Sequence, residues 1–135
     1  MKTYIIAAGG AGFLAVLIAV LVFLRKKPRK LKVEHYEQRW KDLQALLRDK
    51  KRWRDAIIEA DLLLDEALKR RKFRGKTMGE RLVRAQRHFT DNDALWYGHK
   101  LRAQIEQHPD TKLKQNEVKD ALIGIRQALK DLGAL

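Results

Sequence analysis

The sequence predicts an all-α fold in which an N-terminal transmembrane helix is followed by a four- to five-helix bundle. Three observations predict it: an uncharged apolar run near the N-terminus, apolar residues spaced three and four apart through the rest of the chain, and no alternating strand pattern. The 135 residues therefore divide into an anchor (1–24), a basic juxtamembrane linker (25–32) and a cytoplasmic helical bundle (33–135).

The anchor is predicted from its length and lack of charge. Residues 4–24 carry no charged side chain, and a helix of this length extends roughly 31 Å, close to the hydrocarbon thickness of a bilayer. We expect the segment to stay uncleaved, because Phe23, Leu24 and Arg25 stand where a signal peptide needs small residues. Alanines recur every fourth residue from Ala7 to Ala19, a spacing that favours a homodimer of such helices, although alanine is also common in membrane helices generally.

The linker is strongly basic. It follows a segment whose only charged residue is Lys2, so the positive-inside rule places the N-terminus outside the cell and the bundle in the cytoplasm, as in a single-pass membrane protein. Residues 33–135 hold 23 basic and 17 acidic residues, so about half of the net charge of +13 lies outside the bundle. We expect contacts with anionic lipid headgroups or phosphate from Arg25, Lys26, Lys27, Arg29, Lys30 and Lys32.

The first two bundle helices are predicted over 33–48 and 52–71. Apolar residues line one side of each at helical spacing, and the second has a broad stripe from Trp53 to Leu68. No glycine or proline separates them, so one continuous helix is the alternative. We expect the break at the charged run 49–52.

Three further helices follow a loop over 72–76. Thr77 and Glu80 form a capping box that predicts the start of the third helix. Asp91 or Asn92 is the expected cap of a helix over 93–107, which ends before Pro109. The last helix is expected over 116–132, with Gly133 as its stop.

Several kinds of chemistry are excluded or disfavoured by composition. The chain has no cysteine and no serine, which excludes disulfides, thiolate metal sites and a serine nucleophile. No His, Asp and Glu cluster has metal-binding spacing, and the only close set of glycines lies inside the apolar run. We therefore expect no metal and no cofactor.

Three groups of polar residues remain as candidates. Arg102 and His108 border the apolar face of the helix over 93–107 from opposite sides, where they fit a phosphate contact and proton transfer, or alternatively a surface pair with Glu106 and a solvated helix end. Asp61 and Asp65, one turn apart, are expected to be a structural polar pair, with Asp61 reaching Arg102 or His99. A second basic run, at the end of the helix over 52–71, offers phosphate or lipid contacts through Arg70, Arg71 and Arg74.

A family resemblance adds to these expectations. Residues 53–135 resemble a family of small, uncharacterised bacterial proteins that are often membrane-anchored. The resemblance is carried by Ala56-Ile57-Ile58-Glu59-Ala60-Asp61 with Leu64-Asp65, by Gly75-Lys76-Thr77-Met78-Gly79-Glu80-Arg81-Leu82, and by Leu95-Trp96 with His99-Lys100-Leu101-Arg102. The C-terminal half of that family is similar to HEPN domains, helical bundles that often dimerise and include metal-independent ribonucleases.

The resemblance implies a ribonuclease motif that this chain keeps only in part. The HEPN motif is an arginine, usually followed by a polar residue, and a histidine after four to six intervening residues. Arg102 and His108 fit that spacing, whereas Ala103 stands at the polar position and Gln107 where the related small proteins have histidine. We expect a binding or scaffold module for RNA or another protein, tethered to the inner face of a bacterial cytoplasmic membrane, with a membrane-tethered ribonuclease as the alternative.

Overall fold

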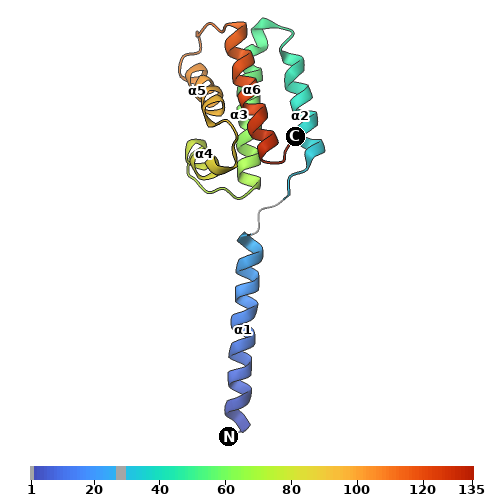
Figure 1. Ribbon diagram of the computed structural model, residues 1–135, viewed down its shortest axis with the longest axis vertical. Helices are drawn as coiled ribbons and strands as arrows, with labels where there is room; N and C mark the ends of the chain where they lie inside the picture. The colour runs from blue at the N-terminus through green and yellow to red at the C-terminus, as the bar shows by residue number, and fades with distance from the viewer. Residues whose placement is uncertain (1, 27–29) are drawn as a thin grey trace.

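The structure is a computed structural model that describes residues 2–26 and 30–135, with the side chains of the first helix described for residues 10–23. Within this part of the chain the fold contains helices and no strand, so the prediction of an all-α fold is confirmed (Figure 1). The α-helices are α1 (Lys2–Lys26), α2 (Val33–Leu46), α3 (Trp53–Arg70), α4 (Met78–Ala85), α5 (Asn92–Gln107) and α6 (Gln115–Asp131), with 3₁₀ turns at Lys50–Arg52 and Gln86–His88.

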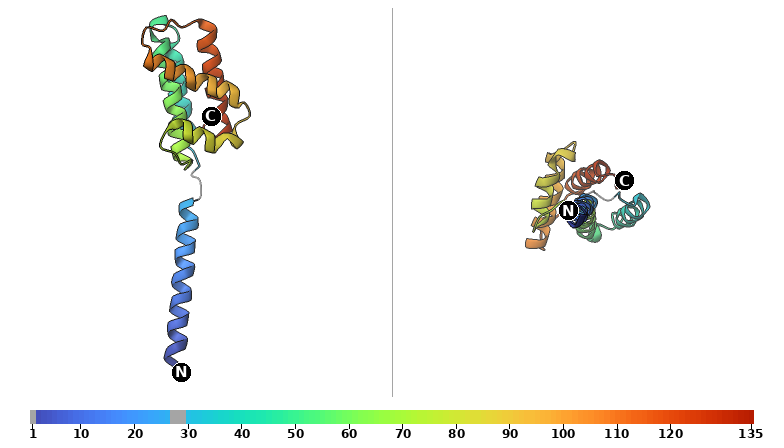
Figure 2. Two further views of the ribbon diagram at one scale, coloured as in Figure 1. Left: turned by 90° about the vertical axis from the view of Figure 1, so that its left-hand side faces the viewer. Right: turned by 90° about the horizontal axis from the view of Figure 1, so that it is seen from below.

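Helix α1 stands apart from the bundle that α2 to α6 form, in both side views (Figures 1 and 2). Among the described residues, no helix combines the length and the apolar character needed to cross a membrane. The prediction of an N-terminal transmembrane helix is therefore wrong, and with it the single-pass topology and the location at the bacterial cytoplasmic membrane.

The break between α2 and α3 lies where the charged run predicted it. Asp49 caps the intervening 3₁₀ turn, because its Oδ1 accepts a hydrogen bond from the backbone N–H of Lys51 at 3.0 Å. At the other end of α3, the predicted loop begins with Lys72, whose φ of 67° is left-handed. The N–H of Phe73 bonds the carbonyl oxygen of Leu68 at 3.1 Å and closes the helix in a Schellman motif.

The predicted caps of the later helices are confirmed. Thr77 Oγ1 accepts a hydrogen bond from the N–H of Glu80, and Asp91 Oδ1 accepts one from the N–H of Ala94. Helix α6 ends at a second Schellman motif with Gly133 at φ 80°. Local sequence therefore sets the boundaries of these helices to within a residue or two.

Helix α3 is the centre of the bundle and packs against α2, α4, α5 and α6. Its apolar stripe is buried from Ala56 to Leu68. The fully buried large apolar side chains come from α3 and from the segments packed around it, and each contributes roughly 1.5–3 kcal/mol through burial. They are Ile57, Leu63, Leu64, Leu68, Leu82, Leu95, Ile105, Ile125, Leu129 and Leu132.

Helices α5 and α6 cross closely because glycine stands at both contact points. A Cβ on Gly98 would lie 2.8 Å from the carbonyl oxygen of Ala121, and one on Gly124 would overlap the carbonyl group of Ala94. Helix α2 has no such partner on α6, and it packs mainly on α3. The bundle is thus closed on the α5 side of α6 and open on the α2 side.

Candidate functional site

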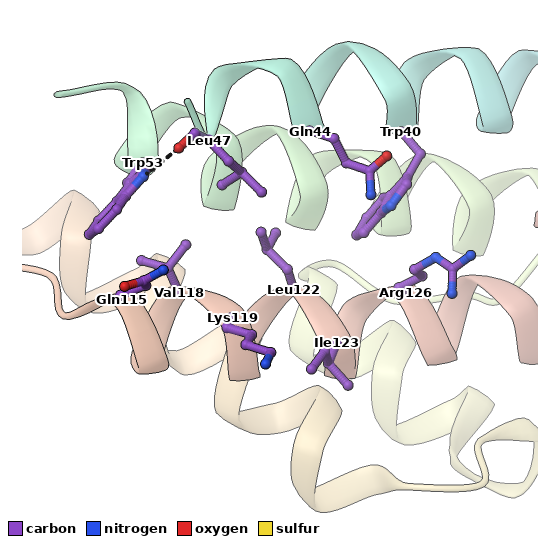
Figure 3. A pocket seen from close by; sticks show the side chains of 10 residues that line it. All are labelled: Trp40, Gln44, Leu47, Trp53, Gln115, Val118, Lys119, Leu122, Ile123 and Arg126. Atoms are coloured by element: carbon purple, nitrogen blue, oxygen red, sulfur yellow. Dashed lines mark hydrogen bonds between the residues drawn. The ribbon is translucent and has the colours of Figure 1, made fainter. Parts of the chain in front are cut away.

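A groove lies along the open side of the bundle, between α2 and α6 (Figure 3). Its volume is about 330 Å³, at the lower end of the range for ligand sites. We call it the α2–α6 groove. Its lining residues are Trp40, Gln44, Leu47 and Trp53 on one side and Gln115, Val118, Lys119, Leu122, Ile123 and Arg126 on the other.

The two walls arise from helical spacing. On α2, Trp40 and Gln44 are one turn apart and Leu47 follows at the end of the helix, so all three face α6 (Figure 3). On α6, Val118 and Leu122 are buried at the floor, whereas Ile123 leaves 55% of its surface exposed. A large exposed aliphatic residue beside an apolar groove indicates a surface that a partner covers.

The two tryptophans differ in their hydrogen bonding. Trp53 Nε1 donates to the backbone oxygen of Leu47 at 2.9 Å, a bond that holds the ring across the α2–α3 turn (Figure 3). Trp40 is only 5% exposed, and its Nε1 is buried with no acceptor among the described residues. A buried donor without a partner costs about 1–3 kcal/mol.

The charged side chains that line the groove are all positive. Lys119 and Arg126 are exposed at its rim, Gln44 and Gln115 add amide groups, and no carboxylate is among the residues that line it. The arrangement therefore favours an apolar ligand with a negatively charged flank.

A polar cluster lies across the bundle, between α3 and α5. Asp61 is fully buried, and its Oδ2 is 2.9 Å from His99 Nδ1 and 3.5 Å from Arg102 Nη1. The contact that the helical wheel predicted for Asp61 is thus present, with both partners. Asp61 Oδ1 has no hydrogen-bond partner among the described residues. The Trp96 ring packs against the His99 ring in a T-shaped contact.

The structure does not bring Arg102 and His108 together. The Arg102 side chain is directed to Asp61, and its Nε lies 3.0 Å from Glu106 Oε1 in an ion pair that lacks hydrogen-bond geometry. The His108 side chain is exposed at the end of α5, where the backbone N–H of His108 donates a hydrogen bond to the carbonyl oxygen of Gln104. Within one copy of the chain, the arginine is held in a structural contact and the histidine faces solvent.

Asp65 is paired differently from Asp61. It accepts two hydrogen bonds from Arg81, from Nε at 2.7 Å and from Nη2 at 2.9 Å, and Arg81 Nη1 also donates to the oxygen of Gly75. The hydrogen bond to Asp65 raises the pKa of Arg81 above its ordinary value. The two aspartates therefore fasten different elements: Asp61 holds α5 and Asp65 holds α4.

Two arginines with structural roles were missed by sequence reasoning. Arg81 was not singled out, although a basic residue on the inner side of α4 is unusual enough to be a signal. Arg54 donates to the backbone oxygens of Ile105 and Pro109 and so caps the end of α5. Its partners are about fifty residues away in the sequence, and no local pattern indicates them.

Some residues of the two predicted basic runs lie together in the structure, and others do not. Lys30, Lys32 and Arg70 line one cleft beside α2. Arg71 instead donates from Nη1 to the backbone oxygen of Leu132 at 2.6 Å, and Arg74 is exposed outside the cleft. The side chains of Arg25, Lys26, Lys27 and Arg29, and that of Ala7, lie outside the described residues.

The α2–α6 groove itself was not predicted. The signal in the sequence is the pair Trp40 and Trp53 together with Ile123, which interrupts the polar face of α6. In the part of the chain that the structure describes, no three His, Asp or Glu residues are grouped to hold a metal ion.

The comparisons with known proteins leave the site to be interpreted from its own chemistry. No protein-family model, no curated protein and no solved structure matches the chain. The HEPN-like resemblance therefore stays a prediction.

Proposed function

We propose that this protein is a binding module that takes an amphipathic helix of a partner protein into the α2–α6 groove. The observation that carries the proposal is the open side of α6: α2 and α6 flank an apolar groove that neither helix fills. An amphipathic helix inserts apolar side chains at intervals of three and four residues into such a groove.

The residues of the groove are of the kinds that dominate binding energy at protein interfaces. Tryptophan and arginine are enriched among such residues, and the groove has Trp40, Trp53 and Arg126. Along α6 the lining runs from Gln115 to Arg126, about 17 Å of helix, which matches three turns of a bound helix.

The charge at the rim specifies the partner further. Lys119 and Arg126 complement a helix with Asp or Glu beside its apolar face. Helix α1 of the same chain is apolar but contains no acidic residue, so it lacks this complement. An acidic amphipathic helix of another protein is therefore the occupant that we propose.

The decisive experiment is photo-crosslinking in cells from the full chain with a benzophenone amino acid at position 123. We expect crosslinks to one acidic helical segment of another protein, and the same probe at Lys130, which is exposed on α6 outside the groove, should not capture it. Arg126→Glu should weaken the complex about tenfold or more, whereas the matched charge reversal Lys130→Glu should leave it unchanged. Crosslinks only to α1, only to a second copy of the chain, or equally from both positions would refute the proposal.

The ribonuclease alternative takes second place, because Arg102 is occupied by Asp61 and Glu106 and His108 is exposed. Cleavage of RNA without metal that disappears in His108→Ala, at unchanged stability, would reverse this order.

A further inference from the structure

A second cleft lies between the segment that leads into α2 and the C-terminal half of α3. Its volume is about 380 Å³. We call it the basic cleft, and its polar lining residues are Lys30, Lys32, His35, Tyr36, Glu66 and Arg70.

The cleft has an excess of positive charge. Lys30, Lys32 and Arg70 have no carboxylate oxygen within 4.0 Å among the described residues. The one carboxylate in the cleft, Glu66, is 3.1 Å from His35 Nε2 and is thus engaged with a neighbour. Three cationic side chains consequently face one space from two segments far apart in the sequence, and a bound anion can compensate their charge.

A buried hydroxyl group at the cleft is a further hydrogen-bond donor. Tyr36 is 2% exposed, and its Oη is buried with no hydrogen-bond partner among the described residues. Burial, and then the negative charge of Glu66, raise the pKa of Tyr36, while Arg70 acts in the opposite sense. The hydroxyl therefore remains protonated near neutral pH and keeps a hydrogen atom to donate.

We propose that the basic cleft binds a phosphate group, either of a free phosphate compound or of a lipid headgroup. A phosphate offers several acceptor oxygens in a tetrahedral arrangement and up to two negative charges, which suits an arginine fork, two ammonium groups and one hydroxyl donor. A single carboxylate offers fewer acceptors and less charge than this set of donors can satisfy.

The surroundings of the cleft support a doubly charged ligand. Lys69 and Lys72 line an adjoining depression that shares Glu66 and Arg70 with the basic cleft. Lys69 is partly neutralised by Asp65 at 3.5 Å, whereas Lys72 has no carboxylate oxygen within 4.0 Å among the described residues and adds to the positive field at the cleft.

The test is a titration of the full chain with two probes at constant ionic strength. One arm follows NMR shifts on addition of inorganic phosphate, and the other follows binding to phosphatidylcholine vesicles with and without phosphatidic acid. Whichever arm shows binding identifies the source of the phosphate group. In that arm Arg70→Gln should weaken binding about tenfold or more, whereas Arg74→Gln should change it less than about twofold, because Arg74 belongs to the same basic run but is exposed outside the cleft.

Tyr36→Phe separates binding from folding. The variant removes a hydroxyl that has no partner in the unbound protein, so stability should not fall, while phosphate affinity should drop about threefold to tenfold. No binding in either arm, equal losses in Arg70→Gln and Arg74→Gln, or unchanged affinity in Tyr36→Phe would each overturn the proposal. Binding to a short RNA that is insensitive to Arg70→Gln would also count against it. Arg126→Glu should alter neither arm, which keeps this test independent of the α2–α6 groove.

Discussion

The two sides of α6 pack against their neighbouring helices in opposite ways. On the α5 side, Gly98 and Gly124 let the two backbones approach so closely that a single added methyl group meets main-chain atoms. On the α2 side, Trp40 and Ile123 stand where small residues would be needed, and a groove of about 330 Å³ remains. The comparison shows that side-chain size at a few crossing points decides which face of a helix is completed by its own chain and which is left for a partner.

The strongest way to break this comparison is to add one methyl group to the closed side. Gly124→Ala should destabilise the fold by about 3 kcal/mol or prevent folding, because the new Cβ overlaps the carbonyl group of Ala94 and the overlap outweighs the helix propensity of alanine. Chemical denaturation of the full chain measures this. The neighbouring change Ile123→Ala, on the open side, should shift stability by only about 0.5 kcal/mol. Similar losses at the two positions would show that α6 does not have two distinct sides.

The next largest effect is expected where α3 is fastened to α5. Asp61→Asn should lower the free energy of unfolding by about 2–3 kcal/mol, because it removes a fully buried charge that faces His99 and Arg102. The matched control is Glu106→Gln, which breaks the half-exposed contact of the same arginine and should cost less than about 1 kcal/mol. If the two changes lower the free energy of unfolding equally, burial does not explain the contribution of the Asp61 contact to stability.

A smaller effect compares the two tryptophans of the open side. Trp53→Phe should cost about 1 kcal/mol, because it deletes the hydrogen bond to Leu47. Trp40→Phe should cost no more, although Trp40 is more deeply buried, because the change also removes an unpaired N–H. Thermal unfolding monitored by circular dichroism ranks the two variants. A clearly larger loss for Trp40→Phe would mean that its indole nitrogen has a partner in solution.

The smallest effect concerns pH at the far end of α2. The fold favours the neutral form of Tyr36 and raises its pKa above the ordinary value of 10.0, so this contribution to stability is complete below about pH 10 and is lost as the pH rises through the raised pKa. Denaturation at pH 8 and at pH 11 should therefore show a larger loss in the wild type than in Tyr36→Phe. Equal losses would indicate that the hydroxyl is already exposed to solvent.

Much of the bundle was predictable from the sequence because its signals are local. Asp49, Thr77, Asp91 and Gly133 each act on backbone groups within a few residues, so the starts and stops of the helices follow from neighbours in the chain. The end of α3 is an exception in detail. The left-handed position falls on Lys72 rather than on a glycine, because the following turn is set by the packing of Phe73 against the core.

The candidate sites were predictable only in part. Helical spacing placed Asp61 toward α5, but it could not decide between His99 and Arg102, and the structure uses both. The same spacing placed Arg102 and His108 on one helix without showing that the first is held by Asp61 and that the second faces solvent. The transmembrane prediction, which rested on the length and lack of charge of the apolar run, was wrong, because no helix among the described residues is both long and apolar enough to cross a membrane.

By itself, the sequence determined that this protein is helical, where its bundle helices begin and end, and which face of each is apolar, because capping and periodicity depend on residues a few positions apart. Only the tertiary structure decided that α6 closes on α5 but stays open toward α2, and that Lys30, Lys32 and Arg70 share a cleft. These features depend on distances between residues that are remote in the chain, which are set by how side chains of different size fill the space between helices.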